Sequence, residues 1–169
     1  NPNDNYAYTE RGVLYANQKQ WDLAASDCKK AIELNPNVAF VYNCQGILYH
    51  HLKKYDLALA EFNKALSLDS EDLFALRATG LIHYEKGETE TAAKYFKKTL
   101  ATDPDLPYSQ LALATIAYLN GDTPKAIELA KSALKNDPRF ADVEHLKLYN
   151  WGEKLIADTQ KLLALSELK

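Results

Sequence analysis

Few residues of this chain have the type and spacing that catalysis or metal binding requires. His50 and His51 are adjacent, but on a helix they face different directions and no carboxylate or thiolate ligand accompanies them. Cys28 and Cys44 are too few for a structural zinc site or a disulfide framework. We therefore expect reduced thiols in the core and no metal site.

Motifs that carry enzyme chemistry are also missing from the sequence. It contains no glycine-rich phosphate loop, no nucleophile elbow, no HExxH helix and no cysteine pair at metal-binding spacing. We expect no catalytic residue and no cofactor, so the remaining chemistry is recognition of a partner.

Charge and hydropathy narrow the kind of partner. The net charge is -3 and no run of lysines and arginines occurs, which disfavours a nucleic-acid ligand. No apolar stretch approaches the roughly 20 residues that a membrane-spanning helix needs, so we expect no membrane insertion. Hydrophobic residues make up 47% of the chain, which contains only 6 glycines and 6 prolines, as is typical of a helical protein folded throughout.

The elements that must position any binding residues repeat every 34 residues. Small residues recur in two columns, and a turn-forming pair recurs in two more. These columns are Gly12, Gly46, Gly80 and Ala114; Ala24, Ala58, Ala92 and Ala126; Asn35, Asp69, Asp103 and Asp137; and Pro36, Ser70, Pro104 and Pro138.

Each column has a physical role in a helical hairpin. A glycine inside a helix costs about 1 kcal/mol of helix propensity, so its recurrence predicts close approach of a second helix. The Asn-Pro or Asp-Pro pair ends one hairpin, because the residue before proline avoids helical angles and proline suits a first helical turn. In the first hairpin the helices are expected at residues 4–17 and 22–34.

These columns resemble the tetratricopeptide repeat family. The second unit matches the family pattern best, and the resemblance covers residues 5–140. It implies an all-α, right-handed superhelical solenoid of antiparallel helix hairpins, with units at about 5–38, 39–72, 73–106 and 107–140 within a domain of residues 1–140. The fourth unit departs from the pattern at Gln110, Ala114, Ala117 and Ala130, and the third at His83 and Thr99, which predicts looser packing there.

Residues 141–169 are expected to cap the last hairpin, whose apolar face would otherwise be exposed. The segment contains no proline, and its apolar residues recur at helical spacing. One long capping helix, bent near Gly152, is the prediction.

The resemblance implies that one face of each first helix lines a concave groove in which partner peptides lie. Helical arithmetic assigns twelve residues to this groove: Tyr6, Thr9, Phe40, Asn43, Ile47, His50, Phe74, Arg77, Leu81, Tyr84, Tyr108 and Tyr118. The aromatic residues near the helix starts either contact a ligand or wedge between hairpins.

Two polar groove residues are stronger candidates for ligand contact. Asn43 and Arg77 sit beside apolar neighbours in mid-helix, where a polar group needs a partner. Arg77 is the one groove residue certain to be positive, which predicts an acidic or carbonyl-rich partner group at the third unit. The clamp that related repeats use for chaperone C-termini matches poorly, since Thr9 and Val13 stand where it needs lysine and asparagine.

The leading hypothesis for function is a scaffold, not an enzyme, that binds a partner protein or peptide segment in the groove. The alternative is an assembly element that associates with other copies of itself or with further repeats of a longer chain. The sequence leaves the location open and favours the cytoplasm over secretion.

Overall fold

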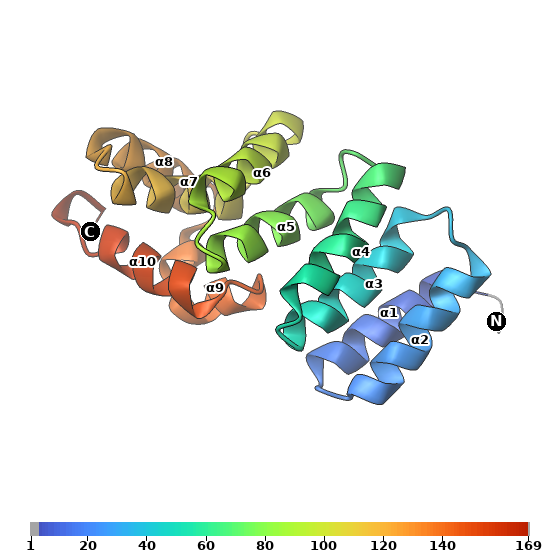
Figure 1. Ribbon diagram of the computed structural model, residues 1–169. Helices are drawn as coiled ribbons and strands as arrows, with labels where there is room; N and C mark the ends of the chain where they lie inside the picture. Colours follow the sequence, from blue (N-terminus) through green and yellow to red (C-terminus); the bar gives the residue numbers. More distant parts are fainter. Residues whose placement is uncertain (1–3, 169) are drawn as a thin grey trace. The chain divides into compact units, whose positions relative to one another are not determined.

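Every regular element between residues 4 and 168 of the computed structural model is helical (Figure 1). Residues 1–3 and Lys169, which the predicted ranges 1–140 and 141–169 include, lie outside the described residues. Consecutive helices form four hairpins: α1 (Asn5–Asn17) with α2 (Trp21–Leu34), α3 (Ala39–His51) with α4 (Tyr55–Leu68), α5 (Leu73–Glu85) with α6 (Thr89–Thr102), and α7 (Pro107–Leu119) with α8 (Thr123–Asn136). The all-α hairpin fold is as predicted.

The turn inside each hairpin places one residue in the left-handed backbone region. That residue is Lys19, Lys53, Gly87 or Gly121, with φ of 60°, 56°, 82° and 83°. The next amide bonds back to a carbonyl five residues earlier; in the first hairpin Gln20 N donates to the Tyr15 carbonyl at 2.8 Å. This bond belongs to the Schellman motif, which ends a helix while pairing its last carbonyls.

The turn between hairpins depends on the aspartate or asparagine before the proline column. Its side chain accepts a hydrogen bond from the backbone amide two residues later, which fixes the turn. The acceptors are Asn35, Asp69, Asp103 and Asp137, at 3.3, 3.0, 3.0 and 3.0 Å. Ser70 can therefore replace proline without loss of the turn.

The glycine column allows the close helix approach that it predicts. A Cβ at Gly46 would lie 2.5 Å from the Phe62 ring, and one at Gly80 would lie 2.9 Å from the Phe96 ring. In the fourth hairpin both partners are alanine, and Ala114 and Ala130 are fully buried.

Cys28 and Cys44 form a disulfide, so the expectation of reduced thiols is wrong. Their Cα atoms are 5.4 Å apart, and the bond joins α2 to α3. Cys28 stands in the column that Phe62 and Phe96 fill in later hairpins. Because Gly12 has no side chain, the two sulfur atoms fit beneath it; a Cβ there would lie 2.6 Å from the Cys44 sulfur.

The chain divides into two compact units within the length of α5. Unit 1 ends at Ala75 and unit 2 begins at Leu76, so each holds about half of the chain. Unit 1 contains the first two hairpins, and unit 2 contains α6, α7, α8 and the C-terminal segment. Between residues 4 and 168, no helix combines the length and hydropathy needed to cross a bilayer.

The C-terminal segment is not the single long helix that was expected. Two short 3-10 helices, Pro138–Ala141 and Ser166–Leu168, flank α9 (Val143–Leu148) and α10 (Glu153–Leu163). The break comes from Asn150, whose φ of 59° is left-handed and ends α9, while Gly152 caps the start of α10. Leu146, Trp151, Leu155 and Leu162 are buried in the core of unit 2.

Candidate functional site

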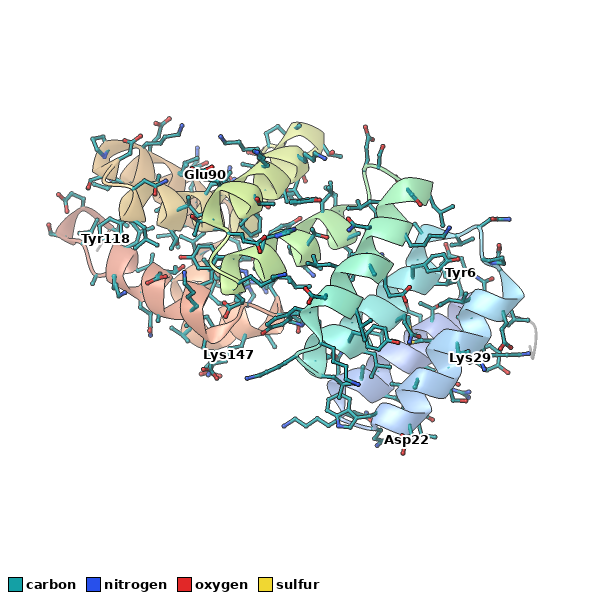
Figure 2. The ribbon with its side chains drawn as sticks, viewed as in Figure 1. Tyr6, Asp22, Lys29, Glu90, Tyr118 and Lys147 are labelled. Atoms are coloured by element: carbon teal, nitrogen blue, oxygen red, sulfur yellow. A yellow bond between two sulfur atoms is a disulfide. The ribbon has the colours of Figure 1, made fainter. Side chains whose placement is uncertain are left out.

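Tyr6 and Phe40 form an open aromatic pair in unit 1. Asp4 caps α1 by accepting a hydrogen bond from Ala7 N at 3.2 Å, which places Tyr6 in the first helical turn. The Tyr6 side chain (Figure 2) is 59% exposed, and its ring centroid lies 5.3 Å from that of Phe40. This exposed aromatic surface can stack against a partner.

Three other predicted groove residues of unit 1 are buried or half-buried. Thr9 is fully buried, and its hydroxyl donates to the Asn5 carbonyl at 2.8 Å. Ile47 is 7% exposed. Phe74 is half-buried, and its ring lies 6.1 Å from that of Phe62. These side chains support the surface from below.

Asn43 is engaged within unit 1. It is 3% exposed, and its Nδ2 donates to Asp72 Oδ2 at 2.7 Å. The other oxygen of Asp72 accepts from Ala75 N at 2.9 Å and so caps the start of α5. Asn43 thus positions a helix cap, and a ligand role for it stays a prediction.

His50 and His51 lie in an aromatic cluster at the end of α3. The His50 ring lies 5.9 Å from Tyr55, whereas His51 lies 6.1 Å from Trp21 and its Nε2 is 3.1 Å from Asn17 Oδ1. Burial, and then the charge of His51, lowers the pKa of His50 to about 4, so it is neutral near pH 7. No group of three potential metal ligands forms among residues 4–168.

Tyr84, a predicted groove residue of unit 2, is covered by α10. It is fully buried, and its hydroxyl donates to Asp158 Oδ2 at 2.9 Å. The ammonium group of Lys154 lies 4.1 Å from the Tyr84 ring centroid. Burial, and then the bond to Asp158, raises the pKa of Tyr84. A partner could reach this ring only by displacing α10.

Arg77 lies beside two tyrosine rings of unit 2 that stack on each other. Its guanidinium carbon lies 5.1 Å from the Tyr108 ring centroid and 5.4 Å from that of Tyr149, which follows α9. Tyr108 is only 7% exposed, and its ring stacks on Tyr149 at 6.0 Å. Leu81 is 2% exposed. The acidic partner predicted at Arg77 stays a prediction.

Glu85 holds the start of α10 in place. Its Oε1 accepts a hydrogen bond from Leu155 N at 3.2 Å and so satisfies an amide in the first turn. A Cβ at Gly152 would collide with this carboxylate. Thr115 and Thr159 also share a buried hydrogen bond of 2.7 Å. Tyr118 (Figure 2) is half-buried against the same core.

Family models place most of the chain in one group of helical repeats. Three models, each described as tetratricopeptide repeat, match residues 6–38, 28–60 and 77–139. The chain belongs to the tetratricopeptide repeat family. Proteins of this family interact with other proteins, and no catalytic family is indicated. No curated protein matches the sequence.

Solved tetratricopeptide repeat structures have the same fold at low sequence identity. PilF of Pseudomonas aeruginosa is 20% identical with a TM-score of 0.72, over 95% of this chain and 75% of that one. YrrB, described as a tetratricopeptide repeat protein with an unusual peptide-binding site, is 19% identical with a TM-score of 0.67, over 96% and 87%.

A third structure holds a peptide. The first tetratricopeptide repeat domain of Spaghetti (RPAP3), bound to the HSP90 peptide SRMEEVD, is 21% identical with a TM-score of 0.64, over 72% of this chain and 96% of that one. At these identities the likeness concerns the fold.

The repeat pattern gave no sign of the contact between Glu85 and the start of α10. This contact depends on a chain reversal at Asn150 that helical spacing does not encode. Gly152 was a usable signal, because a glycine directly before an acidic first turn often marks a helix start.

Proposed function

We propose that this tetratricopeptide repeat chain binds an extended segment of a partner protein on unit 1, at the surface formed by Tyr6, Phe40 and His50. The Tyr6–Phe40 pair carries the proposal, because a 59% exposed tyrosine in contact with a half-buried phenylalanine ring is costly to leave in water. Aromatic side chains of this kind are the usual anchors of protein interfaces.

The matching residues of unit 2 are already covered, which supports unit 1 as the binding surface. There the equivalent column residue, Tyr108, and the groove residue Tyr84 already contact the C-terminal segment. Peptide binding by relatives of the same fold, including YrrB and the Spaghetti domain, supports the class of ligand.

The surface of unit 1 favours stacking over charge in recognition. Tyr6, Phe40 and neutral His50 carry no full charge near pH 7. A partner segment with apolar or aromatic side chains and free backbone amides fits such a surface, since neutral imidazole can still accept one hydrogen bond.

Peptides selected by phage display against the folded chain test the proposal. Calorimetric titration should show that Tyr6→Ala and Phe40→Ala each weaken binding by at least roughly tenfold. Leu57→Ala is the matched control, because Leu57 is 48% exposed in the same unit but lies on the second helix α4. Unchanged affinity in both aromatic variants would remove unit 1 as the binding surface.

Sedimentation of the unliganded chain separates this function from the alternative of self-association. A monomer at all concentrations is expected; a dimer lost on Phe40→Ala would assign the same surface to assembly.

A further inference from the structure

A solvent-open pocket of about 380 Å³ lies among α6, α7 and α8 in unit 2. Its walls are apolar: Ala93 comes from α6, Leu113, Ile116 and Ala117 come from α7, and Leu129 comes from α8. Pockets that bind ligands usually measure about 300–1,000 Å³ and have mainly apolar walls with a few polar groups. None of these residues belongs to the unit 1 surface proposed above.

The pocket exists because the fourth hairpin lacks an aromatic residue that the others carry. Ala117 stands in the column of Tyr15, Tyr49 and His83. In the third hairpin the His83 ring stacks on Tyr95 at 5.5 Å. The residue 34 positions after Tyr95 is Leu129, so the ring pair is replaced by a methyl group and an aliphatic side chain.

Two lysines border this pocket from different helices. Lys97 of α6 and Lys125 of α8 are both exposed, and no ion pair engages either ammonium group within residues 4–168. The one carboxylate in the lining is that of Asp122, which caps α8 by accepting from Lys125 N at 3.3 Å. The border therefore favours negative charge beside the apolar walls.

We propose that this pocket is a second docking site, which binds a protein segment presenting a bulky apolar side chain next to carboxylates. The apolar side chain fills the space left by Ala117, and the carboxylates meet Lys97 and Lys125. Such an anchor buries apolar surface that the pocket now exposes to water, while the charges fix its orientation. The chain then contacts partners through two surfaces of different chemistry.

Dye-labelled peptides test this site by fluorescence anisotropy. The probe has one phenylalanine flanked by glutamates, and its two controls carry alanine for phenylalanine or lysines for the glutamates. The probe is expected to bind at least roughly tenfold more tightly than either control. Equal affinities for the three peptides would overturn the proposal.

Variants of the chain locate the binding. Ala117→Tyr restores the column residue, fills the pocket and should weaken probe binding by at least roughly tenfold. The double reversal Lys97→Glu with Lys125→Glu alters only exposed residues and should weaken it at least as much. Lys94→Glu is the control, an exposed lysine of α6 outside the pocket. Unchanged binding in the double reversal would contradict the proposal even if Ala117→Tyr failed to fold.

Two further outcomes would show that the probe binds elsewhere or that a second copy of the chain fills the pocket. Loss of probe binding on Phe40→Ala with no effect of Ala117→Tyr would assign the probe to unit 1 and reject this site. A dimer of the unliganded chain that Ala117→Tyr dissociates would make a second copy the occupant and likewise overturn the proposal.

Discussion

Tyr6 in unit 1 and Tyr108 in unit 2 occupy the same column of the repeat, but their surroundings differ. Tyr6 is 59% exposed and its ring lies tilted against that of Phe40, whereas Tyr108 is 7% exposed and contacts both Arg77 and Tyr149. The difference comes from α9 and α10, which only unit 2 contains. A repeat register fixes which residues share a helix face, while neighbouring segments decide whether that face is open.

Each unit is also stabilised internally by different features. In unit 1 a disulfide occupies the aromatic position of the first hairpin, and lysines form both left-handed turns. In unit 2 glycines form the turns, and the C-terminal segment completes the core. These contrasts predict separate responses of the units to deletion, reduction and pH.

Deletion of the residues after Phe140 should have the largest effect. It removes Leu146, Trp151, Leu155 and Leu162, each of which stabilises unit 2 by about 2 kcal/mol, or on the order of 8 kcal/mol together. That is comparable with the whole stability of a small domain. We expect unit 2 to lose its cooperative urea transition and the chain to aggregate. An unchanged melting temperature in a monomeric product would contradict this role of the C-terminal segment.

Loss of the disulfide should weaken unit 1 by about 3 kcal/mol, since the bond closes a loop of 16 residues. Urea titration with and without a reductant measures the effect. The double variant Cys28→Ala with Cys44→Ala should have the urea midpoint of the reduced protein, and the reductant should not change it. If the reductant lowered the urea midpoint of that variant as much as that of the native protein, the change would not come from the disulfide.

Acid should weaken unit 1 before unit 2. His50 has a lowered pKa of about 4 against an ordinary 6.5, so its stability contribution is complete above pH 6.5 and falls as pH falls towards 4. At pH 5 the loss is about 2 kcal/mol. His50→Gln should flatten this part of the profile, and an unaltered profile in that variant would exclude His50 as its source.

Asp158 provides the contrast in unit 2. Burial raises its pKa, but hydrogen bonds from Lys161 and Tyr84 outweigh burial and lower it below the ordinary 3.8. Its contribution is therefore complete above about pH 4 and is lost only below that.

Exchange of the turn residues should have the smallest effect. Lys53→Gly should stabilise unit 1 by about 1 kcal/mol, because lysine is strained at a φ of 56°. Gly87→Lys should destabilise unit 2 by a similar amount. Nothing lies within 4 Å of a Cβ added at Gly87, so backbone strain is the only cost of the substitution. Equal stability of both variants and the native chain in urea would show that the turns tolerate either residue.

The sequence predicted the hairpins well, because each column reports a local requirement. Gly46 marks a helix contact and Asp69 marks a turn, and neither depends on distant parts of the chain. The contacts that the sequence did not predict all join distant segments. Cys28 of the first hairpin forms a disulfide with Cys44 of the second, and Glu85 accepts a hydrogen bond from Leu155, which lies 70 residues later.

The departures from the repeat pattern predicted looser packing, but Thr99, Gln110, Ala114 and Ala130 are all buried. Ala117 predicted looser packing, but the resulting pocket also needs Leu129 and two lysines from α6 and α8, which spacing alone does not bring together. The accessibility of the predicted groove residues was equally beyond the pattern, because Asn150 and Gly152 direct the C-terminal segment over unit 2.

Nitration of tyrosines by tetranitromethane, followed by peptide mass spectrometry, tests most directly whether the C-terminal segment covers Tyr84 and Tyr108 within unit 2. In the native protein Tyr6 should be modified early, while Tyr84 and Tyr108 should stay unmodified until urea unfolds the chain. Modification of Tyr84 and Tyr108 as fast as Tyr6 in the native protein would contradict the account.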